Sequence, residues 1–172
     1  MTAMMEPLVD TLIEDPRWTG FGLEDLAEAA AQATLAALLL RVDGFEISLL
    51  GCDDRRISAL NADFRGKPQP TNVLSWPAAE LGADTPGDRP HLPKAGPVTM
   101  PAELGDIAIA WETCDHEAAA QSKPMRDHVS HLLVHGTLHL LGYDHIFEAD
   151  ATLMEGLEAR ILQGMGIANP YE

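Results

Sequence analysis

Four of the seven histidines in this 172-residue chain fall within one fifteen-residue stretch, and their spacing is typical of metal ligands. They are His131, His135, His139 and His145. On a helix, His135 and His139 are one turn apart and project from the same face, so their imidazoles can converge on one ion. Gly142 permits a sharp turn that can bring His145 to the same ion. Three neutral imidazoles leave a fourth position for water, which is typical of a catalytic zinc site.

Gly136 stands where a metal-dependent protease carries its catalytic glutamate. The spacing that starts at His135 matches the zincin-like H-E-x-x-H-x-x-G-x-x-H signature of metzincin proteases at every ligand position. Those proteases use the Glu as the general base that activates water. Because Gly136 has no side chain, the sequence keeps the metal ligands of a protease but not its base.

His131 lies one turn before the first of these ligands and is a weaker ligand candidate. A helix places residues i and i+8 about 12 Å apart along its axis, which is too far for His131 and His139 to bind one ion. A fourth protein ligand would also close the site to water. We therefore expect His131 to have a structural role or to orient a ligand imidazole. The remaining histidines lack ligand spacing and are expected at the surface: His91, His116 and His128.

Three stretches of the chain resemble the YbeY family of metal-dependent endoribonucleases, bacterial factors of ribosomal RNA maturation. Residues 135–145 are similar to that family's H-G-x-L-H-L-x-G-Y-D-H signature throughout its length. Residues 60–77 resemble its L-N-x-x-Y-R-x-K-x-x-P-T-[DN]-V-L-S-F-P block, and residues 104–107 resemble its L-G-D-I strand entrance. The departures are modest: Phe64 replaces the usual Tyr, Trp76 replaces the usual Phe, and a Pro-rich insertion follows near residues 80–103.

The resemblance implies a metal site, a substrate and partners. By that resemblance, His135, His139 and His145 hold one Zn²⁺ ion, and Arg65 is the basic residue that faces the metal cleft. It also implies a single-strand-specific endoribonuclease that acts in ribosomal RNA processing, at the 3′ end of the small-subunit RNA, and in ribosome quality control. The implied partners are single-stranded RNA, ribosomal RNA, and the ribosome or the proteins of its small subunit.

The charge distribution favours binding of RNA at one local site. The chain has 11 basic and 27 acidic side chains and a net charge of −16, which argues against a protein that coats duplex nucleic acid or anionic membrane. Only the short window of residues 55–76 has a basic excess, with four basic side chains and one acidic. Within it, Arg65 and Lys67 are the candidates to bind a scissile phosphate, Arg65 through its planar guanidinium and Lys67 as a point charge. The plain alternative for Arg65 is a surface cation at a helix end.

The residues leave the general base open. Zinc would polarise a phosphoryl oxygen or lower the pKa of its bound water toward ~7, and Arg65 would stabilise the charge on the phosphate. The base is then zinc-bound hydroxide, Asp106 or Asp144, or else the ribose 2′-OH is the nucleophile. Asp144 can instead orient an imidazole. Asn72 and Ser75 are weaker candidates for lining the same cleft.

Two other functions stay open at this point. One is a metalloprotease or another zinc hydrolase on a similar scaffold, which Gly136 disfavours. The other is a non-catalytic ribosome-assembly factor that uses the metal only to fix the end of its helix. Cleavage of casein but not of RNA would favour the first, and wild-type function without Arg65 would favour the second.

The apolar pattern predicts an α+β fold, a small mixed sheet of about four strands flanked by helices. Strands are expected at residues 8–14, 45–49, 71–76 and 107–111. Helices are expected at residues 23–41, 55–64, 112–121, about 124–141 and 147–161. Ser122 and Pro124 are expected to open the metal helix as its N-cap and first-turn proline. That helix and the Arg65 loop are expected to meet at one cleft.

The chain is expected to form a single domain over residues 1–172, because its length suffices for one substantial core but hardly for two. Six prolines and little apolar periodicity between residues 77 and 104 predict a mobile surface loop at about 78–103. Cys52 and Cys114 are too few for a disulfide framework, which favours a reduced, cytoplasmic location. No apolar run approaches the ~20 residues of a bilayer span, so we expect neither secretion nor membrane insertion.

Overall fold

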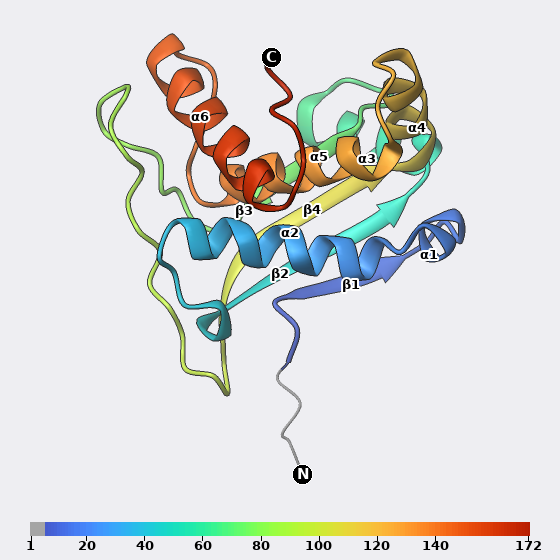
Figure 1. Cartoon of the computed structure of the whole chain (residues 1–172). Coiled ribbons are helices and arrows are strands. Elements are labelled where there is room, and N and C mark those ends of the chain that lie inside the picture. The colour runs from blue at the N-terminus through green and yellow to red at the C-terminus, as the bar shows by residue number, and fades with distance from the viewer. Residues whose placement is uncertain (1–5) are drawn as a thin grey trace.

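A mixed four-stranded sheet forms the centre of the fold in the computed structural model, which describes residues 6–172 (Figure 1). The strands are β1 (Val9–Ile13), β2 (Phe45–Cys52), β3 (Val73–Pro77) and β4 (Ala102–Ala110). They lie in the order β1-β2-β4-β3, with β1, β2 and β4 parallel and β3 antiparallel to β4. The α+β fold with a mixed sheet of about four strands is therefore confirmed.

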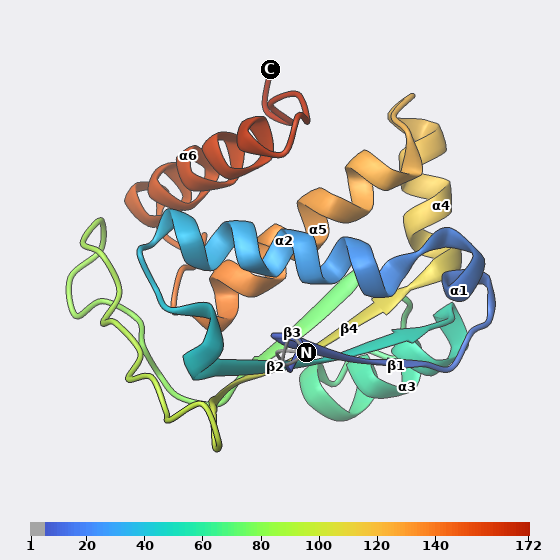
Figure 2. The ribbon, with the colours of Figure 1, turned by 60° about the horizontal axis from the view of Figure 1, so that its bottom comes forward.

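Helices cover both faces of this sheet (Figure 2). Over residues 6–172 they are α1 (Arg17–Phe21), α2 (Leu23–Ala37), α3 (Asp54–Arg65), α4 (Trp111–Ala120), α5 (Met125–Leu140) and α6 (Glu148–Gly164), with a 3-10 turn at Val42–Gly44. Helices α2 and α5 pack side by side on one face, and α6 packs on α5. Helix α3 lies on the opposite face. None of these helices is long and apolar enough to cross a membrane.

Strand β4 separates the two cores, because successive side chains of a strand point to opposite faces. Ile107 and Ile109 belong to the larger core, which includes α2, α5 and α6. Ala108 packs with Ile57 of α3 in a smaller core on the other face. The same alternation puts Asp106 on the α3 side, where it is exposed.

The strand that leads into α4 begins earlier than expected. It starts at Ala102 instead of residue 107, and Trp111 begins α4 instead of ending the strand. Gly105 hides the strand pattern, because its φ of 140° and the irregular register near Ile47 interrupt the alternation. A Cβ at position 105 would lie 2.2 Å from the backbone oxygen of Trp76. Glycine is therefore required at this close approach of β4 to the backbone of β3.

One helix end, one helix cap and one additional helix also differ from the expectation. The helix expected over residues 23–41 ends at Ala37. Ser122 is not an N-cap: it has a φ of 54° in the turn before α5, whose N-cap is Pro124. The short helix α1 was not expected, and it is fixed by fully buried Trp18, whose indole N–H donates to the backbone oxygen of Cys52 (2.9 Å).

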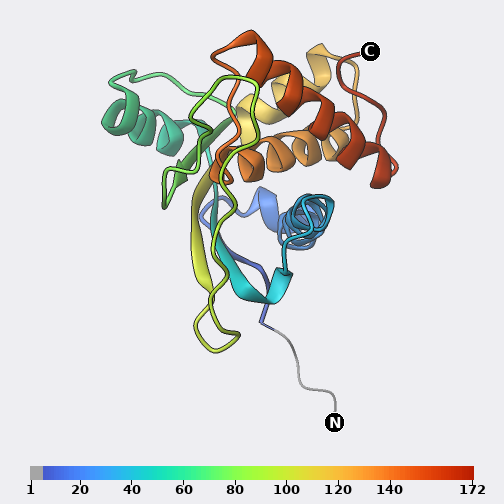
Figure 3. The same ribbon diagram turned by 90° about the vertical axis from the view of Figure 1, so that its left-hand side faces the viewer.

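Residues 78–101 contain no helix or strand and link β3 to β4 along one side of the molecule (Figure 3). Several hydrogen bonds fix the course of this segment, among them the following two. The backbone N–H of Gly87 donates to Asp150 of α6 (2.8 Å), and the backbone N–H of His91 donates to the oxygen of Leu81 (2.7 Å). The first part of the segment therefore lies against the start of α6, and Leu81 lies close to Gly142 in the turn after α5.

Candidate metal centre

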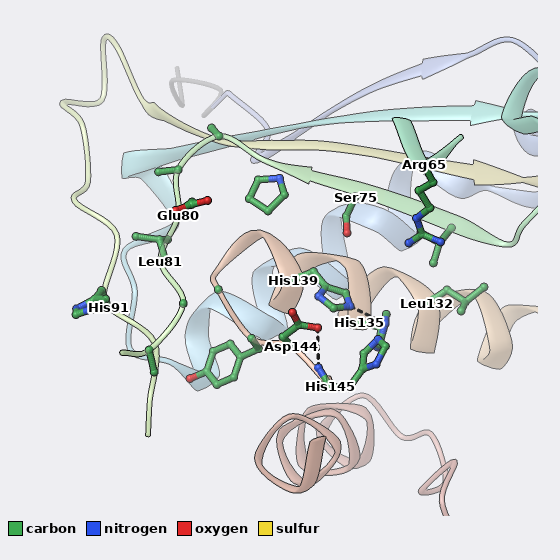
Figure 4. A pocket seen from close by; sticks show the side chains of 18 of the residues that line it. Arg65, Ser75, Glu80, Leu81, His91, Leu132, His135, His139, Asp144 and His145 are labelled. Atoms are coloured by element: carbon green, nitrogen blue, oxygen red, sulfur yellow. Dashed lines mark hydrogen bonds between the residues drawn. The ribbon is translucent and has the colours of Figure 1, made fainter. Parts of the chain in front are cut away.

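Three histidine side chains converge at the end of α5 (Figure 4). Their ligand nitrogens all lie within 4.8 Å of one another: they belong to His135, His139 and His145. From residue 128 to residue 140, α5 is buried except at His131, His135 and His139, which follow one another at one-turn intervals. The partly exposed stripe of this part of the helix therefore consists of imidazoles. The α5 spacing and the turn that follows it therefore build the cluster predicted from the sequence.

The turn after α5 depends on Gly142. This residue has a φ of 95°, a conformation that side chains other than glycine rarely adopt. A Cβ there would also lie 2.7–2.8 Å from the carbonyl group of Leu81. Glycine is thus needed both for the reversal that returns His145 to α5 and for the close approach of residues 78–101.

The donor set fits a zinc-like divalent cation. The Nε2 atoms of His135 and His139 are 3.0 Å apart, and two nitrogens of a tetrahedral zinc ion are about 3.3 Å apart when each Zn–N bond is ~2.0–2.1 Å. Burial, together with the neighbouring His135 and His145, lowers the pKa of His139 to about 4. His139 is therefore neutral near pH 7, which is the form that binds a metal.

A buried carboxylate, Glu158 of α6, lies behind the histidines and was not predicted. Its Oε1 accepts hydrogen bonds from His131 Nε2 (2.7 Å) and His135 Nδ1 (3.2 Å). Burial alone would raise the pKa of this carboxyl group, but the hydrogen bonds from the two histidines outweigh it and lower the pKa to about 2. One feature of the sequence could have indicated this buried carboxylate: Glu158 lies on the apolar face of α6, in line with Met154 and Ile161.

Asp144, the carboxylate expected to orient an imidazole, makes a different contact. Its Oδ1 accepts the backbone N–H of His145 (2.7 Å), which fixes the turn and not the ring (Figure 4). Asp144 does line the cavity beside the histidines. Asp106 does not, because it lies on the opposite face of the sheet. The expectation that Asp106 reaches this cleft is therefore wrong.

Arg65 and the histidines line one cavity of about 1110 Å³. Figure 4 shows Arg65 and Ser75 on the sheet side of this cavity and the histidines on the α5 side. Asn72 lines it as well, and residues 77–84 form its other end. Lys67 is exposed and does not line it. The expected cleft between the metal helix and the Arg65 loop is thus present.

The end of α3 positions Arg65. Asp53 is the N-cap of this helix, and its side chain accepts the backbone N–H of Arg56 (2.8 Å); Gly66, with a φ of 70°, is the C-cap. Asn61, only 4% exposed, donates from Nδ2 to the backbone oxygen of Gln69 (2.9 Å). This bond holds the loop after Arg65 against its own helix.

A second, partly buried network fixes the start of β3. Glu117 of α4 accepts hydrogen bonds from Asn72 Nδ2 (3.0 Å) and contacts His128 Nε2 (2.9 Å). His128 is 5% exposed, so the expectation that it lies at the surface is wrong. Its burial follows from its place on the side of α5 that faces α4. His91 and His116 are exposed, as expected, and His91 lines the far end of the cavity.

The side of α5 at Gly136 faces the sheet. A Cβ at position 136 would meet Ile107 of β4 at 3.3 Å, so a longer side chain would enter the larger core and not the cavity. The position that supplies the base of a metzincin protease therefore has no room for one here.

We expect Gly136→Glu to destabilise the protein by about 3 kcal/mol, because a carboxylate would be buried against Ile107 without a partner. Gly156→Glu on α6 is the matched control, since a Cβ there meets no atom within 4 Å. Thermal denaturation of both variants measures the difference. Equal melting temperatures would contradict close packing of α5 on β4 at this position.

Comparisons with known proteins give one consistent family. A family model described as "Endoribonuclease YbeY" matches residues 13–166. The Endoribonuclease YbeY of Ruegeria pomeroyi is 61% identical over 163 residues, which cover 95% of this chain and 97% of the relative. The Endoribonuclease YbeY of Cereibacter sphaeroides is 58% identical over 167 residues, which cover 97% of this chain and 100% of the relative.

A solved structure shares the fold. The solution structure of TM1509 from Thermotoga maritima matches with a TM-score of 0.58 and covers 90% of this chain and 87% of its own. Because the two sequences are only 18% identical, this match supports the fold and carries no information about the site.

Proposed function

Because this chain belongs to the YbeY family of endoribonucleases, we propose that it is a single-domain, metal-dependent enzyme that hydrolyses single-stranded RNA in the cavity between α5 and β3. The observation that supports this most strongly is that three convergent imidazoles and the Arg65 guanidinium line the same cavity. We further propose action on ribosomal RNA, including the 3′ end of the small-subunit RNA, and in ribosome quality control, with ribosomal partners and a cytoplasmic location.

In this proposal His135, His139 and His145 hold one Zn²⁺ ion. Imidazole nitrogens are ligands that zinc prefers, and three of them leave a coordination position open. When bound, the ion supplies Lewis acidity toward a phosphoryl oxygen and lowers the pKa of coordinated water.

Arg65 binds the scissile phosphate in the proposal. Its guanidinium can donate two parallel hydrogen bonds to phosphate oxygens and so stabilise the negative charge that develops on them. Lys67, outside the cavity, contacts the RNA backbone beyond the scissile bond. Because the chain carries a net charge of −16, binding of RNA depends on these few cations and not on a broad basic surface.

Asp144 is the carboxylate that can accept a proton at the reaction centre. It lines the cavity with the histidines, whereas Asp106 lies on the opposite face of the sheet. One oxygen of Asp144 accepts the backbone N–H of His145, which holds the carboxylate in place. Two alternatives do not use Asp144. In one, coordinated water with a lowered pKa would supply the hydroxide, and in the other the ribose 2′-OH would be the nucleophile.

Metal removal tests the proposed function. We expect the purified protein to contain about one zinc per chain and to cleave a labelled single-stranded RNA faster than the same sequence in a duplex. Chelation should abolish cleavage, and added Zn²⁺ should restore it, because the metal ion held by the triad supplies the Lewis acid. Metal analysis and gel assays before and after chelation measure both effects. Undiminished cleavage after complete metal removal would contradict the proposal, and cleavage of casein but not of RNA would favour a protease.

A further inference from the structure

Three hydrogen-bond donors converge on the carboxylate of Glu158, which is 1% exposed. Its Oε1 lies 2.7 Å from His131 Nε2, 3.2 Å from His135 Nδ1 and 3.0 Å from Tyr171 Oη, and its Oε2 lies 3.0 Å from the same hydroxyl. Burial of a carboxylate is costly unless hydrogen bonds compensate for it. The three donors supply that compensation and fix the carboxylate in one position.

The bond to His135 determines which ring nitrogen faces the centre of the cluster. A proton on Nδ1 of His135 donates to Glu158, which leaves the lone pair on Nε2. That Nε2 is the atom 3.0 Å from His139 Nε2. A carboxylate that accepts a hydrogen bond from a ligand imidazole orients the ring. It also makes the other ring nitrogen more basic and so a stronger metal ligand.

We propose that Glu158 is a positioning residue that fixes His135 as a metal ligand, and that His131 and Tyr171 hold Glu158 in place; this inference rests on the proposed metal site. His131 is too far from His139 to bind the same ion, but in this proposal it supports the metal site through its hydrogen bond to Glu158. It also makes Tyr171, in the segment after α6, part of the site: this residue lines the main cavity and a second cavity of about 350 Å³ behind the histidines.

A purely structural role is the competing explanation. The bond between Glu158 and His131 also ties α6 to α5, so loss of Glu158 can lower stability without any effect on the metal. The two explanations differ in the metal affinity of the folded protein. Only a positioning role changes that affinity, because only it acts through the ring of His135.

The test compares Glu158→Gln with a matched control. Glu155 lies one turn earlier on α6, lines the second cavity with Glu158, and makes no side-chain hydrogen bond within residues 6–172. Glu155→Gln therefore removes a nearby charge but none of the hydrogen bonds of the network. For each protein, zinc affinity is measured by competition with a chromophoric chelator, the site geometry by the absorption spectrum of the Co²⁺-substituted protein, and folding by melting of the metal-free protein.

We expect Glu158→Gln to weaken zinc binding by about 10- to 100-fold and to alter the Co²⁺ spectrum, while Glu155→Gln matches the wild type. Tyr171→Phe, which changes an exposed side chain, should weaken binding by roughly threefold, because one of the donors that hold Glu158 is lost. It provides the test if Glu158→Gln does not fold. A lowered melting temperature with wild-type zinc affinity in both variants would overturn the inference.

Failure of this inference is distinguishable from failure of the proposed function. If wild-type protein binds zinc and His139→Ala does not, while Glu158→Gln and Tyr171→Phe bind like wild type, only the positioning role is wrong. If wild-type protein binds no zinc at the triad, the proposed metal site itself is wrong.

Discussion

Replacement of His139 by Ala is expected to abolish both zinc retention and RNA cleavage. His139 is the central member of the triad: its Nε2 is 3.0 Å from His135 Nε2, and its ring centre is 5.2 Å from that of His145. Two remaining imidazoles, one of them on the exposed His145, are too few to retain a catalytic zinc ion. Because the metal provides the Lewis acid, cleavage should fall by at least about 1000-fold. Metal analysis and a labelled-RNA assay on the same preparation measure both losses.

His116→Ala is the matched control for this experiment. His116 is exposed on α4 and does not line the cavity, so its loss should leave metal content and cleavage unchanged. Melting of the two metal-free variants checks that both are folded. Cleavage at the wild-type rate by a zinc-free His139→Ala protein would end the metal-dependent interpretation.

The histidine cluster was predictable because its geometry is local. One helical turn separates His135 from His139, and a glycine turn returns the chain at His145, so spacing alone brings the three side chains together. Arg65 is different, because seventy residues separate it from His135. Only the resemblance to a family linked these two parts of the sequence, and no periodicity could have done so.

The contacts that were missed depend on how the elements pack. Glu158 reaches the histidines only because α6 lies on α5, and that packing cannot be deduced from the amphipathic pattern of α6 alone. Asp106 was misplaced because the early start of β4 and the irregularity at Gly105 hid which face each residue takes. A shift of one residue along a strand exchanges its two faces. Charged residues at such positions are therefore the least predictable part of the site.

Removal of the Arg65 guanidinium is expected to slow cleavage without loss of the metal. Arg65 lines the cavity but is not part of the triad, so Arg65→Ala should retain the wild-type zinc content. A preorganised donor to a developing oxyanion contributes about 3 kcal/mol, which corresponds to roughly a 100-fold lower rate. Arg65→Lys should recover only part of this loss, since an ammonium group cannot form the paired hydrogen bonds of a guanidinium. Single-turnover cleavage of labelled RNA measures the rates.

Arg55→Ala separates a specific role of Arg65 from a general effect of positive charge. Arg55 belongs to the same basic window and the same helix, but it does not line the histidine cavity. Its removal should change cleavage little, and any effect should disappear as salt screens exposed charges. Zinc loss in Arg65→Ala would assign Arg65 to support of the metal centre. Undiminished cleavage with zinc retained would remove Arg65 from the reaction and leave the histidines without a partner for the phosphate.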